Sequence, residues 1–182
     1  SENHPLVTAA LAVATIDALA GIGLSAAVKW PNDLVVEGGP APGKLAGILA
    51  EYVSGPPPAV VVGLGLNLTW PVRDDDSPLG ATSIRACGHK VDRWDMLAVI
   101  LAGFDTCLED LAKVGGSKRL RSEQVARSAT LGRRVRAETP SGPVEGTAVD
   151  ITNDGSLLIR PDGQASQSVP VTVGDVTHLR PV

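Results

Sequence analysis

Aromatic side chains are scarce in this chain, whose 182 residues include one Phe, one Tyr and three Trp. A hydrophobic core must therefore be built mainly from Ala, Val, Leu and Ile. Apolar residues nevertheless make up 43% of the sequence, which excludes a disordered chain because enough apolar surface is present to drive folding. The length allows one or two domains with a substantial core.

Cysteines are few, and the chain has neither a strong net charge nor a long apolar run. The two cysteines, Cys87 and Cys107, do not make a disulfide framework, and no Cys/His cluster has zinc-site spacing, so we expect a reduced, cytoplasmic setting. The net charge of −4 gives no whole-chain attraction to nucleic acid or to an anionic membrane. The most apolar stretch, 6–16, is shorter than a membrane span and lacks the pattern of a signal peptide. We expect a buried helix there and no membrane contact.

Helical spacing and turn signals predict the elements of the first 130 residues. A helix should run from Pro5 to about residue 20, and apolar residues recur at helical spacing from 92 to 114. A second, basic helical stretch follows at 118–128. The run 59–64 is almost continuously apolar, which predicts a central strand covered on both faces. Glycine- and proline-rich breaks separate the predicted strands, which are 25–28, 34–37, 44–53 and 59–66.

The texture of the sequence changes after residue 130. Short alternating segments are joined by turn signals such as Asn153-Asp154-Gly155, and several short strands with tight turns predict a small β-barrel. We therefore expect two domains, at 1–130 and 131–182. The predicted strands of the second domain are 134–138, 144–150, 157–160, 169–173 and 176–179.

Two charged segments stand out in the first domain. Lys29-Trp30-Pro31-Asn32-Asp33 is followed by Lys44-Leu45-Ala46-Gly47-Ile48-Leu49. Lysines and carboxylates are rarely fully buried unless they are paired, so these segments predict the mouth of a site. The two lysines would come from opposite sides of one hairpin and could neutralise two anions that meet there. Strict strand alternation would place Lys44 and Gly47 on opposite faces, so that Gly47 could contact a ligand only through its backbone.

These segments, together with Gly63-Leu64-Gly65-Leu66-Asn67, resemble the signature of the biotin protein ligases, or biotin–[acetyl-CoA-carboxylase] ligases. The segments 81–84, 131–135 and 174–180 also resemble parts of that family. The resemblance implies an α+β fold, with a mixed-sheet catalytic domain like that of class II aminoacyl-tRNA synthetases and then an SH3-like β-barrel. It further implies that biotin is activated by ATP as biotinyl-5′-AMP and passed to a lysine of a biotin carboxyl carrier domain.

The resemblance also implies roles for individual residues. Lys44 would bridge the biotin carboxylate and the α-phosphate, while Lys29 and Asn32 would contact phosphates. Asp33 would hold Mg²⁺ or deprotonate the acceptor lysine, and the sequence leaves both roles open. An Asp at such a corner can also simply form a turn with its own backbone. The remaining implied contacts are Gly47, Gly63 and Gly65 with biotin, and Asn67 with the adenylate.

The family implies ATP and Mg²⁺ as co-substrate and metal, biotin as substrate and no tightly bound cofactor. The protein would be a monomer or a homodimer. Family members carry upstream a Ser-Thr-Asn segment and an Arg/Gly-rich loop that covers the adenylate, and neither occurs in these 182 residues. We therefore expect a catalytic domain that is incomplete at its N-terminal side. The family's optional helix-turn-helix is missing too, so we expect no DNA binding.

Several alternatives stay open at this point. The chain could be a non-catalytic remnant or interaction module of the same fold, or a lipoate–protein ligase, which has a related catalytic fold. A cluster of basic residues could be a solvated face, or it could guide ATP or an acidic carrier domain to the site. The basic residues in question are seven of the 16 in the chain, namely Lys118, Arg119, Arg121, Arg127, Arg133, Arg134 and Arg136.

Overall fold

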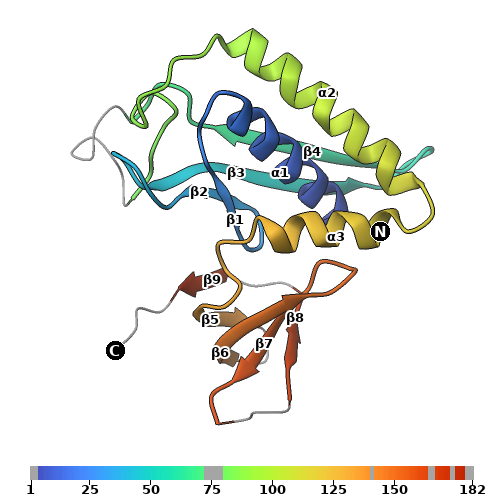
Figure 1. The fold of residues 1–182 in the computed structure, drawn as a ribbon. Coiled ribbons are helices and arrows are strands. Elements are labelled where there is room, and N and C mark those ends of the chain that lie inside the picture. The colour runs from blue at the N-terminus through green and yellow to red at the C-terminus, as the bar shows by residue number, and fades with distance from the viewer. Residues whose placement is uncertain (1–3, 72–79, 140–141, 164–166, 173–174, 179–182) are drawn as a thin grey trace.

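Two antiparallel sheets and three helices form the part of the chain that the computed structural model describes, residues 4–71, 80–139, 142–163, 167–172 and 175–178. The first sheet and the helices lie together, and the second sheet lies below them, with α3 between the two sheets (Figure 1). No helix among the described residues is both long and apolar enough to cross a membrane.

The first sheet contains four strands in the order β1-β2-β3-β4. Their bounds are Ala27–Lys29, Asp33–Val36, Gly43–Val53 and Ala59–Leu66. Short connections join successive strands, and such connections can join only antiparallel neighbours. The expected mixed sheet is therefore wrong for the described strands: parallel pairing is limited there to two isolated bridges, Val28 with Ser128 and Lys44 with Ala81.

The three helices confirm the helical predictions within about two residues. They are α1 (His4–Gly21), α2 (Arg93–Ala112) and α3 (Gly116–Ala126). Helix α1 lies against the sheet, and its Leu19 is fully buried in one core with side chains of β2 and β3 (Figure 1). Asp92 caps α2, because its carboxylate accepts hydrogen bonds from the backbone N–H groups of Trp94 and Asp95.

Strand β4 lies at an edge of the described sheet, so the prediction of a central strand covered on both faces is wrong. Exposure alternates along β4: Val62 packs against the core, whereas Val61 is 57% exposed. Helices α1 and α2 lie over one face of the sheet, and in the described chain no element covers the other face along β4. An unbroken apolar run does not reveal this, because Ala, Val and Gly occupy the exposed positions.

The second sheet has five strands in the order β8-β7-β6-β5-β9. Its core contains the fully buried Val135, Leu157 and Ile159, as expected where apolar side chains alternate along strands. All five predicted strands are present, although residues 173 and 179 lie outside the described residues. The strand bounds are β5 Arg134–Thr139, β6 Gly142–Ile151, β7 Leu157–Pro161, β8 Val169–Val171 and β9 Asp175–His178.

Candidate active site

One row of residues crosses all four strands of the first sheet. Lys29 on β1 lies directly opposite Asp33 on β2, Asp33 lies opposite Gly47 on β3, and Gly47 lies opposite Gly65 on β4. Directly paired residues point to the same face of a sheet. These four residues, all predicted from the sequence as site residues, therefore share one face, and it is the face opposite the buried Leu34.

Lys44 joins this face through an irregularity in β3. The register shifts between Leu34, which pairs with Ala46, and Val35, which pairs with Lys44, so that Leu45 is an extra residue. A bulge of this kind leaves two neighbouring residues on the same side of the strand, and Leu45 and Ala46 are indeed both buried. The prediction that Lys44 and Gly47 lie on opposite faces is therefore wrong.

The result is an ion pair over the glycine. Lys44 Nζ lies 2.6 Å from Asp33 Oδ1, and the two side chains are 50% and 21% exposed. A Cβ built on Gly47 would lie 3.5 Å from Lys44 Nζ and 3.6 Å from Asp33 Oδ1. An ammonium has three donors, so Lys44 keeps donors for an anion while it is held by Asp33.

An open groove of about 420 Å³ lies over these residues. Its floor is formed by Gly47, Gly63 and Gly65, and Lys44 with Asp33 stands at its side. None of the three glycines has a positive φ, and a Cβ on Gly63 or Gly65 would come no closer than 3.8 Å to its neighbours. The fold therefore does not require glycine at these positions, and their smallness leaves room above the sheet. The full lining is Asn32, Asp33, Lys44, Gly47, Ile48, Leu49, Gly63, Leu64 and Gly65.

The backbone of Lys44 is fixed from three sides. Its N–H donates to the Gly80 carbonyl at 2.8 Å, and its own carbonyl accepts from the Thr82 N–H at 2.8 Å. The side chain of Asn67 donates to the Thr82 carbonyl at 2.9 Å and reaches the Lys44 carbonyl at 3.5 Å. Asn67, predicted to face a nucleotide, thus lies beside the groove and positions Lys44. The roles of Gly80 and Thr82 had no signal in the sequence beyond the resemblance of 81–84.

Asn32 connects the β1–β2 turn to β3. Its Nδ2 donates to the Ile48 carbonyl at 2.7 Å, and its own carbonyl accepts from the Ile48 N–H at 2.9 Å. Within the described chain Asn32 makes no further side-chain hydrogen bond, so one N–H and Oδ1 remain for a ligand. Lys29 is half-buried and forms no ion pair with a described residue.

Trp30, although it belongs to the same segment, does not line the groove. It is 3% exposed and packs in the core of the second sheet. This placement could not be predicted from the residues around Trp30, because its hydrogen-bond partners are 100 and 125 residues away along the chain.

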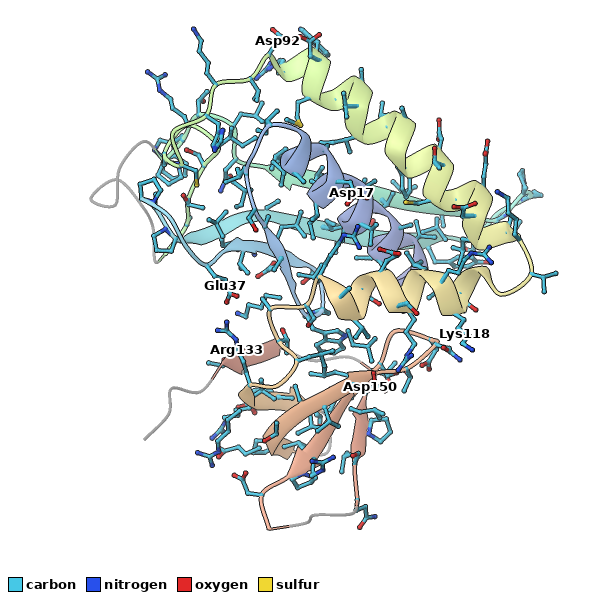
Figure 2. The ribbon with its side chains drawn as sticks, viewed as in Figure 1. Asp17, Glu37, Asp92, Lys118, Arg133 and Asp150 are labelled. Carbon is cyan, nitrogen blue, oxygen red and sulfur yellow. The ribbon has the colours of Figure 1, made fainter. Side chains whose placement is uncertain are left out.

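The basic cluster does not form one free cationic face. Arg133 pairs with Glu37 at 2.5 Å across the two sheets, and Arg127 pairs with Asp17 at 2.8 Å. Figure 2 shows Arg133 and Glu37 close together at the junction, and Asp150 at the edge of the second sheet that faces α3. Asp150 is paired with Arg121 at 2.5 Å. These partly exposed ion pairs favour a solvated face over a guide for ligands.

A second groove of about 460 Å³ lies between α2 and β4. Its lining is apolar apart from Arg93, and it includes Leu64, Leu66, Trp94 and Leu97. It offers no pair of cations, so the charged row on the other face of the sheet is the better candidate for chemistry on anions.

Two protein-family models match this chain. Residues 1–67 match the Biotin/lipoate A/B protein ligase family, and residues 130–179 match the Biotin protein ligase C terminal domain. The biotin–[acetyl-CoA-carboxylase] ligase of Paracoccus denitrificans is 34% identical over 167 residues, which are 87% of this chain and 67% of the relative. This chain belongs to the biotin protein ligase family.

Other members of the biotin protein ligase family are longer than this chain. The Mycobacterium tuberculosis biotin–[acetyl-CoA-carboxylase] ligase is 38% identical over 84% of this chain but only 53% of its own length. The chain thus spans about half to two thirds of the curated relatives it matches. An Aquifex aeolicus biotin protein ligase in complex with biotin and ATP has a TM-score of 0.78 at 19% identity, over 98% of this chain and 74% of that one. At this identity the likeness establishes the shared fold.

Proposed function

We propose that this chain supplies the biotin- and ATP-binding face of a biotin protein ligase. The observation that carries the proposal is the row Lys29, Asp33, Gly47 and Gly65, with Lys44 brought beside it by the bulge. The related Aquifex protein is described in complex with biotin and ATP, which supports the same two ligands here.

The two lysines fit a reaction in which two anions must meet. A carboxylate that approaches an α-phosphate meets electrostatic repulsion, and positioned ammonium groups lower that cost. Lys44, half-exposed at the side of the groove, would contact both the biotin carboxylate and the α-phosphate. Lys29, one strand beyond Asp33 in the row, would contact the phosphates together with Asn32.

The glycine floor fits a flat ligand lying on the sheet. Gly63 and Gly65 are exposed, and a side chain at either would rise into the groove. Close approach of a ligand to backbone is a common reason for glycine inside a strand. We assign this floor to the biotin rings, and Asn67, behind Lys44, to the adenylate end of the site.

The proposed reaction has two steps. A biotin carboxylate oxygen attacks the α-phosphorus of ATP, a bond to that oxygen forms, and the bond to pyrophosphate breaks. The amine of an acceptor lysine then attacks the acyl carbon of biotinyl-5′-AMP and AMP leaves, while the proton of the amine passes to a base. The residues of this chain contribute binding, orientation and charge neutralisation.

Asp33 is the carboxylate at the site, with two possible tasks. Magnesium is commonly held by one or two carboxylates together with substrate phosphates. Asp33 and the phosphates of ATP would together form such a ligand set, and the ion would bind with the nucleotide and offset its negative charge. In the described chain no group of three or more His, Cys, Asp and Glu side chains gathers to hold a metal by itself. Asp33 could instead take the proton from the acceptor lysine.

The wider assignments belong to the same proposal. The acceptor would be a biotin carboxyl carrier domain, as in carboxylase-directed relatives, and the protein would act in the cytoplasm as a monomer or homodimer. Two Bacillus relatives are named bifunctional ligase/repressors, and the groove residues of this chain support the ligase function. We assign residues 1–130 to a catalytic domain of the class II synthetase type and 131–182 to an SH3-like barrel.

Calorimetric titration of the chain with a non-hydrolysable biotinyl-adenylate analogue tests the proposal. We expect saturable binding at one site, and weaker binding of the matching lipoyl-adenylate analogue. Circular dichroism on the same sample controls for folding. A folded sample that binds neither analogue would contradict the proposal, and preference for the lipoyl analogue would favour a lipoate–protein ligase instead.

A further inference from the structure

Trp30 connects the β1–β2 hairpin to the second sheet. Its indole lies among Val135, Leu157 and Ile159 in the core of that sheet, and its Nε1 donates to the Gly155 carbonyl at 2.9 Å. Gly155 belongs to the β6–β7 turn. A side chain from the first sheet thus fills the core of the second and satisfies its own N–H there, as a buried indole requires.

The backbone around Trp30 is tied to the segment that leads into the second sheet. The Trp30 N–H donates to Thr130 Oγ1 at 3.0 Å. Val28 N–H donates to the Arg127 carbonyl at 2.7 Å, and Ala129 N–H donates to the Val28 carbonyl at 2.8 Å. The short strand β1 is therefore held between β2 on one side and the segment 127–130 on the other.

Lys29 stands between these two anchored neighbours. Val28 and Trp30 are 2% and 3% exposed, and strand alternation turns Lys29 to the opposite face, toward Asp33 and Gly47. Strand β1 has only three residues, so its own ladder bonds to β2 are few. The position of Lys29 must depend on what holds Val28 and Trp30.

We infer that Trp30 is a positioning residue through which the second sheet fixes β1. It thereby fixes Lys29 beside the groove over Gly47, Gly63 and Gly65. The indole fills space in the core of the second sheet, so its removal leaves a cavity there and frees the end of β1. The link to ligand affinity rests on the proposed function, whereas the link to the order of β1 does not. The two can be measured separately.

Hydrogen–deuterium exchange of the chain, read by mass spectrometry, tests the order of β1. In Trp30→Ala we expect exchange to accelerate at least tenfold in the peptide covering 27–36 and in 153–156, and to change less than twofold in 59–66. Trp30→Phe keeps an apolar ring but loses the Nε1 bond, and should give an intermediate effect. Trp94→Ala and Trp94→Phe are the controls, because Trp94 is 68% exposed on α2, and should leave all three peptides unchanged.

Affinity for the biotinyl-adenylate analogue is the second measurement on the same variants. We expect a loss of at least tenfold in Trp30→Ala, partial recovery in Trp30→Phe and no change in the Trp94 variants. Faster exchange in 153–156 alone would overturn the inference, since Trp30 would then stabilise only the second sheet. An equal rise in 59–66 would also overturn it, since the effect would then be on overall stability. If Trp30→Ala does not fold, the Phe variant decides by the same criteria. Absence of analogue binding by the wild-type chain would count against the proposed function, while the exchange result would still judge the role of Trp30.

Discussion

Lys44 and Asp33 form a 2.6 Å ion pair between neighbouring strands. Asp33 lies opposite Gly47, and regular alternation along β3 would put Lys44 on the other face of the sheet. The bulge at Leu45 turns Lys44 to the side of Asp33. The pair is partly exposed, and exposed ion pairs contribute only about 0–1 kcal/mol to stability. Its position beside the glycine floor therefore points to ligand binding more than to folding.

Replacing Lys44 by Ala should separate affinity from stability. We expect affinity for the biotinyl-adenylate analogue to fall at least tenfold, because hydrogen bonds to charged groups contribute about 1.5–3 kcal/mol and 1.4 kcal/mol is a factor of ten. The melting temperature should change by no more than about 2–4 °C, the shift for about 1 kcal/mol in a protein of this size. Calorimetry and thermal melting measure the two quantities.

Lys113→Ala is the matched control for this variant. Lys113 pairs with Asp110 at the same distance, 2.6 Å, at the exposed end of α2 and away from the groove. It should show the same small change in melting temperature with unchanged affinity. Equal affinity losses in both variants, or none in Lys44→Ala, would refute the role of Lys44.

Gly65→Ala tests the glycine floor. A Cβ at this position would lie 3.8 Å from the Gly47 carbonyl oxygen, which is an ordinary contact, and Ala in a strand costs less backbone entropy than Gly. We expect equal or slightly higher stability in chemical denaturation, together with at least a tenfold loss of analogue affinity. Gly55→Ala is the control, because an added Cβ in this β3–β4 turn meets nothing within 4 Å; it should leave stability and affinity unchanged. Unchanged affinity in Gly65→Ala would contradict the assignment of the biotin rings to the glycine floor.

Much of this site could be predicted because its residues cluster along the sequence. Lys29, Asn32 and Asp33 share one turn, and Gly63 and Gly65 share one strand. The side on which Lys44 points could not be predicted, because a bulge depends on how β2 and β3 align and not on the composition of either. Likewise, an apolar run such as 59–64 indicates a strand but not which neighbours cover it.

Gly155→Ala should destabilise the second sheet. Gly155 has φ +88°, and an added Cβ would lie 2.8 Å from Pro5 Cβ at the start of α1. Gly163→Ala shares the unfavourable φ, at +80°, but meets nothing within 4 Å. We expect Gly155→Ala to lower the free energy of unfolding by about 1–3 kcal/mol more than Gly163→Ala, because overpacking adds to the backbone cost. Urea denaturation measures the difference, and equal losses would show that the Pro5 contact relaxes freely.

Asp154, in the same turn, should make the stability depend on acid. Hydrogen bonding from the Thr152 side chain, followed by smaller backbone and Ser156 contributions, lowers the pKa of Asp154 below its ordinary 3.8. A lowered pKa in the folded state means that the contribution is present above the unfolded value and is lost as the pH falls through the folded value. Asp154→Asn should therefore lose less stability than the wild type when the pH drops below about 3.8. Denaturation at pH 7 and pH 3 gives this comparison, and parallel losses in both proteins would contradict it.

The placement of Trp30 shows a second limit of sequence analysis. Its segment predicts a site, and its neighbours Lys29 and Asp33 are found there, but the indole serves the other sheet. The bonds that decide this join residues 100 and 125 positions apart, and nothing in the local pattern distinguishes an indole at a ligand from one in a neighbouring core.

The bulge at Leu45 also determines what a one-residue deletion in β3 would do to the site. Before the extra residue, the even-numbered position 44 faces the groove. After it, the odd-numbered positions Gly47 and Leu49 face the groove. Loss of one residue here would restore a regular ladder and cost little hydrogen bonding, yet it would turn either the lysine or the glycine floor toward the core. The number of residues between Lys44 and Gly47 therefore matters to the site as much as their identity.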